Sequence, residues 1–213
     1  MNASSERSLL QGAAGDIEVL QDAPADGQPP RGTAVIAHPH PLFGGTMDNK
    51  VVQTLARAFV LHGWRAVRFN FRGVGRSAGD HDKGRGELDD LRTVVAQCAA
   101  EGPLALAGFS FGSFVAAGAV SDLAASRDLR SLVFVGTAVS RFPVLPLAPE
   151  LHERALLVHG EQDDTVTLAD VMDWARPQNL PVTVMPGASH FFHGQLTTLR
   201  GVVLRHLRAT CGS

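Results

Sequence analysis

The sequence has few cysteines, no excess of one charge and no long apolar run, and each absence excludes a class of protein. Its two cysteines, Cys98 and Cys211, are too few for a disulfide framework. Its 19 Lys and Arg balance 21 Asp and Glu without forming a basic run, so we expect neither a nucleic-acid nor a membrane partner. No apolar stretch approaches the roughly 20 residues that cross a bilayer.

The N-terminal segment also lacks the charged-then-apolar pattern of a secretory signal. Together with the isolated cysteines, this predicts a cytoplasmic protein. The 213 residues contain no repeat or compositional break and suit one hydrophobic core, so we expect a single domain over 1–213. Both a monomer and a homodimer remain open.

Segments with the strand pattern alternate with segments of helical spacing. Residues 7–22 predict a hairpin, and short apolar runs typical of strands buried on both faces follow it. Strands are expected at 33–37, 66–71, 103–107, 129–135, 155–159 and 182–185, and helices at 49–61, 87–100, 113–120, 168–175 and 195–207. The alternation predicts an α/β fold: a mostly parallel sheet, antiparallel at its N-terminal edge, with helices on both faces. The irregular insert 140–153 is too short for a cap domain.

The most informative stretch is Gly-Phe-Ser-Phe-Gly at 108–112, between a predicted strand and a predicted helix. This G-x-S-x-G pattern is typical of a nucleophile elbow, a strained turn that presents a serine hydroxyl above the edge of a sheet. The flanking glycines leave room for the neighbouring backbone. The pattern therefore predicts Ser110 as a nucleophile.

A serine hydroxyl needs an adjacent base, and a carboxylate must orient that base. An acidic turn follows the strand at 155–159 and contains Glu161, Asp163 and Asp164. We favour Asp163 as the orienting acid and keep Asp164 and Glu161 as alternatives. The order of nucleophile, acid and base then matches that of α/β-hydrolases.

The base is expected after the strand at 182–185, where two histidines stand three residues apart. We favour His190, which directly follows the strand, over His193. His159 ends a strand and is expected to be buried and hydrogen-bonded. The histidines that follow no pattern are expected at the surface: His62, His81, His152 and His206.

The oxyanion of an acyl-transfer intermediate needs backbone N–H donors, one of them from the residue after the nucleophile, here Phe111. The second donor is expected in the segment 38–45. Its two prolines have no N–H, which leaves Leu42, our preference, or His40. The pair of histidines at 38 and 40 has no third ligand at a suitable spacing, so we expect neither a metal nor another cofactor.

Taken together, these segments resemble the α/β-hydrolase superfamily, and in particular its small bacterial branch without a cap domain, which is related to dienelactone-hydrolase-like esterases. The resemblance covers most of the chain from residue 33 onward and rests on the motifs at 38–50, 69–77, 108–112, 159–163 and 187–192. It implies a serine hydrolase with Ser110, Asp163 and His190 as its triad and backbone donors at Leu42 and Phe111. Dienelactone hydrolases carry a cysteine nucleophile, so their substrate class is not implied.

Apolar side chains near the motifs, Leu42, Phe43, Phe111 and Phe191, indicate an acyl pocket with only a short insert above it. We therefore expect a small-molecule substrate, an ester or thioester with a short to medium acyl chain. The same triad would serve an acyltransferase, an amidase or a peptidase. A binding module without catalysis is the remaining alternative.

Overall fold

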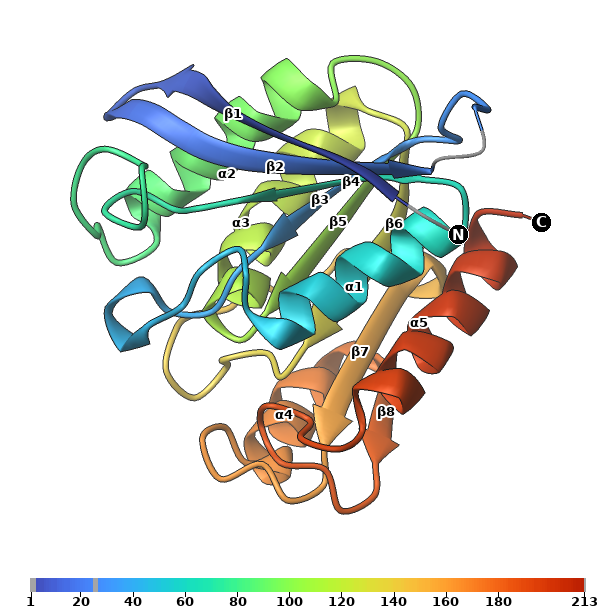
Figure 1. Ribbon diagram of the computed structural model, residues 1–213. Helices are drawn as coiled ribbons and strands as arrows, with labels where there is room; N and C mark the ends of the chain where they lie inside the picture. The colour runs from blue at the N-terminus through green and yellow to red at the C-terminus, as the bar shows by residue number, and fades with distance from the viewer. Residues whose placement is uncertain (1–2, 25–26, 213) are drawn as a thin grey trace.

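The computed structural model describes residues 3–24 and 27–212, in which eight strands form one sheet of order β1-β2-β4-β3-β5-β6-β7-β8 (Figure 1). The strands are β1 (Ala3–Gly12), β2 (Gly15–Pro24), β3 (Thr33–Ala37), β4 (Arg65–Phe69), β5 (Leu104–Phe109), β6 (Leu129–Val135), β7 (Ala155–Gly160) and β8 (Val182–Met185). The helices are α1 (Lys50–Leu61), α2 (Arg85–Cys98), α3 (Phe111–Ser126), α4 (Leu168–Ala175) and α5 (Leu196–Thr210). Short 3-10 helices lie at η1 (Pro41–Phe43), η2 (Pro149–Arg154) and η3 (Arg176–Gln178).

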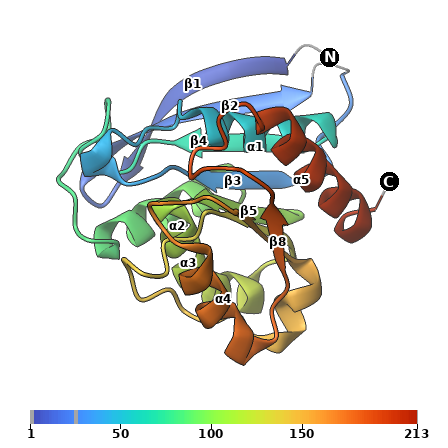
Figure 2. The ribbon, with the colours of Figure 1, turned by 90° about the horizontal axis from the view of Figure 1, so that it is seen from below.

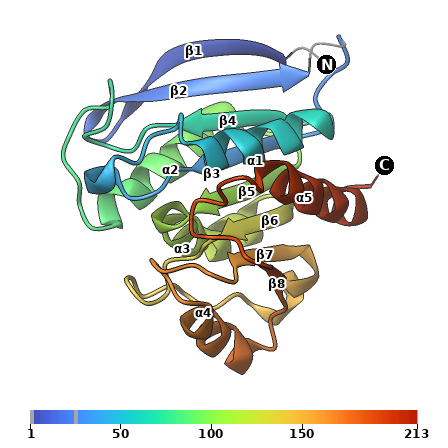
Figure 3. The same cartoon turned by 60° about the horizontal axis from the view of Figure 1, so that its bottom comes forward.

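The sheet is parallel from β4 to β8 and antiparallel at its N-terminal edge. β1 and β2 form the predicted hairpin, which turns between Gly12 and Gly15, and β2 pairs antiparallel with β4. Figure 3 shows the strands in this order from the hairpin to β8. The predicted α/β fold, mostly parallel with an antiparallel edge, is therefore confirmed.

Helices cover both faces of the sheet. α1 and α5 pack side by side on one face, and Figure 2 shows them on the side away from α2, α3 and α4. The central strand β3 is buried along its whole length because it packs against both helical layers. Since β-branched and apolar residues fill such strands, their continuous apolar runs were recognisable in the sequence.

The carboxyl ends of the parallel strands meet at one edge, where sites form in such sheets. The loops after β3, β5, β6, β7 and β8 all begin at that edge. The insert 140–153 contributes one short 3-10 helix, η2, and adds no cap domain. In the described part of the chain, no helix combines the length and the apolar character needed to span a membrane.

Candidate active site

The elbow between β5 and α3 holds Ser110 in a backbone conformation that is rare for a residue with a side chain, at φ 56° and ψ −116°. Both flanking glycines are required by close backbone approach. A Cβ at Gly108 would lie 2.5 Å from backbone atoms of Gly112, and one at Gly112 would lie 2.3 Å from the carbonyl oxygen of Ala37. The turn is therefore tight enough to bring the start of α3 against the end of β3.

The loops after β5, β7 and β8 bring the three predicted catalytic side chains together. The hydroxyl oxygen of Ser110 lies 3.0 Å from Nε2 of His190, and Nδ1 of the same ring lies 2.6 Å from Oδ2 of Asp163. All three residues are buried. This is the relay of hydrogen bonds that a nucleophile, a base and an orienting acid require.

Asp163 is fixed in the turn after β7 by two backbone donors. Its Oδ1 accepts hydrogen bonds from the N–H groups of Thr165 at 3.0 Å and Val166 at 2.9 Å, which leaves Oδ2 for His190. Burial alone would raise the pKa of Asp163, but the hydrogen bonds from His190 and Val166 outweigh it and lower that pKa. The carboxylate therefore stays ionised beside the imidazole.

The alternative acids and the alternative base lie elsewhere. Asp164 is exposed and only its Oδ1 is near a donor, the Thr165 hydroxyl at 3.4 Å. Glu161 accepts a hydrogen bond from the backbone of Gly187 at 2.8 Å, which ties the β7 loop to the β8 loop. His193 is exposed.

His159 is buried beneath the site and bonded to the backbone, as predicted. Its Nε2 lies 2.9 Å from the carbonyl oxygen of Val166 and 3.5 Å from Oδ2 of Asp163. Burial lowers the pKa of His159, so the ring is neutral and supports the turn that carries Asp163.

The candidate oxyanion donors are backbone N–H groups of the elbow and of the loop after β3. The N–H of Phe111 opens α3 and has no partner within the helix. The N–H of Leu42, however, donates to Nδ1 of His40 at 3.2 Å, and the Leu42 side chain is 70% exposed. Among the described residues, no hydrogen bond takes the N–H of His40, whose ring lines the cavity at Ser110. The geometry therefore favours His40, the alternative, over Leu42.

His38 supports this loop from inside. Its Nε2 accepts the N–H of Phe71 at 3.0 Å, and its Nδ1 lies 2.6 Å from the carbonyl oxygen of Pro39. Because both ring nitrogens are engaged with the backbone, His38 is not placed to bind a metal. No set of three or more His, Cys, Asp or Glu side chains in the described ranges is arranged to hold one.

A cavity of about 480 Å³ opens at Ser110. Apolar and aromatic groups dominate its wall, namely the rings of His40, Phe43, Phe111 and Phe142 and the side chains of Ala138 and Val166. Of the four predicted pocket residues, Phe43 and Phe111 line this cavity, although Phe43 is 86% exposed, and Leu42 does not line it. Phe191 packs edge-on against the ring of His190 instead, with centroids 5.2 Å apart.

The expectation that four unpatterned histidines lie at the surface is wrong for His62, which is buried, whereas His81, His152 and His206 are half-buried. His81 lies near the cavity, with its ring 4.7 Å from that of His40 and its Nδ1 2.7 Å from Oε1 of the buried Glu87. Because His81 stands in a long connection without periodicity, nothing in the sequence places it there.

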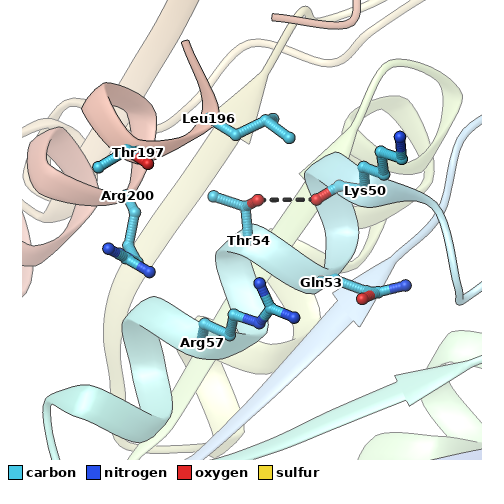
Figure 4. A pocket seen from close by; sticks show the side chains of 7 residues that line it. All are labelled: Lys50, Gln53, Thr54, Arg57, Leu196, Thr197 and Arg200. Atoms are coloured by element: carbon cyan, nitrogen blue, oxygen red, sulfur yellow. Dashed lines mark hydrogen bonds between the residues drawn. The ribbon is translucent and has the colours of Figure 1, made fainter. Parts of the chain in front are cut away.

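A second cavity, of about 380 Å³, lies between α1 and α5 (Figure 4). Arg57 reaches into it from α1 and Arg200 from α5. It shares no lining residue with the cavity at Ser110 and contains none of the predicted site residues. We therefore assign the candidate active site to the elbow.

Comparison with known proteins identifies the family of the chain. The Hydrolase_4 family model, described as "Serine aminopeptidase, S33", matches residues 28–158. An uncharacterized protein of Rickettsia prowazekii is 31% identical over 75% of this chain and 71% of its own length.

Two solved structures are similar over nearly the whole chain. An alpha-beta serine hydrolase homologue from Coxiella burnetii is 40% identical, covers 95% of this chain and 97% of its own, and superposes with a TM-score of 0.83. A protein of Xanthomonas campestris, described as a serine hydrolase without a lid, is 36% identical, covers 98% and 95%, and has a TM-score of 0.85. The chain therefore belongs to the α/β-hydrolase superfamily, in its small branch of serine hydrolases without a cap.

Proposed function

We propose that this chain hydrolyses carboxylic esters or thioesters of short to medium acyl chains through an acyl-enzyme on Ser110. The observation that carries the proposal is the continuous pair of hydrogen bonds that joins Ser110 to His190 and His190 to Asp163. The volume of the cavity, about 480 Å³, and the shortness of the insert 140–153 favour a substrate with a small acyl group.

In this mechanism the Ser110 oxygen attacks the substrate carbonyl carbon while its proton passes to Nε2 of His190. The carbonyl oxygen becomes an oxyanion, which the N–H groups of Phe111 and His40 stabilise at the start of α3. The imidazolium, held by Asp163, then gives its proton to the leaving alcohol or thiol. Water attacks the acyl-enzyme by the same steps and releases the acid and free Ser110.

A peptidase is the second candidate, since the family model that matches describes serine aminopeptidases. An aminopeptidase must bind a free α-ammonium group, which calls for a carboxylate in the pocket. The described residues that line the cavity include no acidic side chain and one arginine, Arg141. The charge of this wall favours an ester or thioester over a peptide with a free amino end.

The test is active-site labelling. A fluorophosphonate should label the native protein and fail to label Ser110→Ala, and the same substitution should abolish hydrolysis of p-nitrophenyl esters and acyl thioesters. Ser121→Ala removes an exposed serine from the same helix, α3, and should change neither result. Full hydrolysis by Ser110→Ala, or a native protein that is never labelled, would contradict the proposal and favour a binding module.

A further inference from the structure

The charge of the cavity at Ser110 carries information on the substrate that the triad does not. Arg141 is the one permanently charged side chain among the described residues that line it. In the described part of the chain, no carboxylate pairs with the Arg141 guanidinium. An arginine at the edge of a largely apolar wall is therefore available, with its planar set of donors, to a ligand that enters the cavity.

The position of Arg141 is fixed by the turn that follows β6. Its N–H donates to the carbonyl oxygen of Ala138 at 3.1 Å, and the N–H of Phe142 donates to the same oxygen at 3.0 Å. The Phe142 ring stacks on that of Phe114 with centroids 4.9 Å apart, which anchors the turn on α3. The backbone is held while the Arg141 side chain stays exposed and unpaired.

The two buried acidic groups near the site, Asp163 and Glu87, do not neutralise Arg141. Asp163 is buried behind His190 and committed to it. Glu87 is fully buried and accepts hydrogen bonds from the N–H groups of Asp82 and Gly84 at 2.9 and 2.7 Å. Neither carboxylate lines the cavity.

We propose that the substrate of this enzyme is anionic, an ester or thioester that carries a carboxylate which Arg141 binds while the carbonyl carbon stands at Ser110. The inference rests on the proposed function and adds a substrate class to it. A guanidinium binds a carboxylate through two parallel hydrogen bonds, so it selects for that group by geometry as well as charge. The aromatic wall holds the apolar part of the same molecule.

Two matched pairs of substrates test the proposal and locate the carboxylate. On the acyl side, monoethyl glutarate is compared with its neutral isostere, in which an isopropyl group replaces the carboxylate. On the alcohol side, the butyrate ester of a hydroxy acid is compared with the butyrate ester of a branched alcohol in which an isopropyl group replaces the carboxylate. In at least one pair, Arg141→Ala should lower the ratio of kcat/KM for the anionic ester to kcat/KM for the neutral ester by about 5- to 20-fold. This change lies in the lower part of the range for a charge-assisted hydrogen bond, because Arg141 is exposed. The neutral ester should keep its rate.

Arg57→Ala is the matched control, since it removes one exposed arginine from the cavity between α1 and α5 (Figure 4). It lowers the net charge equally and should leave the ratio unchanged. Equal effects of the two substitutions would reduce the role of Arg141 to long-range attraction and overturn the proposal. An unchanged ratio in Arg141→Ala would also overturn it, while continued hydrolysis of neutral esters would leave the proposed function standing.

A binding experiment separates this proposal from the proposed function. In at least one of the two pairs, Ser110→Ala should bind the anionic ester more tightly than its neutral counterpart in titration calorimetry, and adding Arg141→Ala should remove the difference. If the native protein hydrolyses no ester but this binding depends on Arg141, the hydrolase proposal fails and the anion site stands. If the binding does not depend on Arg141, the anion site is wrong.

Discussion

The carboxylate of Asp163 accepts three hydrogen bonds, and each of its oxygens has a separate task. Oδ1 accepts hydrogen bonds from two backbone N–H groups and so closes the turn, and Oδ2 accepts a hydrogen bond from Nδ1 of His190. An asparagine has one acceptor oxygen in place of two, so it cannot both close this turn and hold the imidazole in the same tautomer.

We therefore expect Asp163→Asn to lower kcat by up to about 10⁴-fold, as in other triads. Asp164→Asn makes the same chemical change at the next, exposed position and should leave kcat nearly unaltered. Steady-state hydrolysis of p-nitrophenyl esters measures both, and thermal melting shows whether each variant is folded. A larger loss in Asp164→Asn would transfer the role to that carboxylate.

At the scale of elements, the site depends on the contact between the N-terminus of α3 and the end of β3. Gly112 makes that contact possible, because a Cβ there would lie 2.3 Å from the carbonyl oxygen of Ala37. The same contact affects the distance between the N–H group of Phe111, the first residue of α3, and that of His40, in the loop that follows β3. The separation of the oxyanion donors therefore depends on how a helix packs against the end of a strand.

Gly112→Ala should force α3 away from β3 and lower kcat by about 10²-fold or more, the size of effect seen when one oxyanion donor is lost. Gly118→Ala is the control in the same helix, since its Cβ would meet Leu88 at an ordinary 3.5 Å. That variant should keep its activity and gain up to about 1 kcal/mol in stability from helix propensity. Kinetics and chemical denaturation of both variants check the pair, and full activity in Gly112→Ala would refute the argument.

Elements were predictable where burial on both faces leaves a continuous apolar run. β3 and β6 have the predicted bounds for this reason, whereas β8 has them although it is a partly exposed edge strand. β4 was expected over 66–71 but spans Arg65–Phe69: the N–H of Asn70 still donates to the carbonyl oxygen of Glu18 in β2 at 2.9 Å, whereas Phe71 bonds outside the ladder. The Asn70 side chain accepts the N–H of Met47, and the N–H of Phe71 donates to His38. Such side-chain bonds leave no periodic pattern in a sequence.

At the scale of the whole molecule, several buried groups have a pKa that is lower in the folded state than in the unfolded chain. Protonation of these groups therefore opposes folding. Burial, together with the charge of His40, lowers the pKa of His38 from 6.5 to about 4. Burial also lowers the pKa of His62, His159 and His206. For Glu18, burial raises the pKa, but hydrogen bonds from Arg76, Asn70 and Arg7 outweigh it and lower the value. Every one of these groups binds its proton more readily in the unfolded chain.

Stability should therefore be fully present above about pH 6.5 and fall as the pH drops toward 4, with His38 alone contributing on the order of 3 kcal/mol. His38→Asn should flatten this dependence even though it lowers stability at neutral pH by freeing the N–H of Phe71. His193→Asn, at an exposed position, should preserve the native slope. Denaturant midpoints across this pH range give the slopes, and an unchanged slope in His38→Asn would contradict the assignment.

The placement of the candidate triad was predictable because parallel strands end at one edge, so residues just past β5, β7 and β8 had to meet there. Two residues of the cavity wall, Phe43 and Phe111, were predicted, but the rest of the wall was not. Arg141 and Phe142 come from a turn in the insert after β6, whose sequence has no periodicity, and their neighbours are set by ring packing against α3. The choice between Leu42 and His40 also depended on one local bond, from Leu42 to the His40 ring.

The turn that carries Arg141 and Phe142 is attached to β6, whereas the three reacting side chains are attached to other strands of the sheet. On the proposed function, selectivity and reactivity can therefore evolve separately at the exposed positions of this turn, whereas the buried Ala138 packs against Val166, which helps to hold Asp163. A mutant library confined to positions 140 and 141 would sample new substrates while retaining the chemical step.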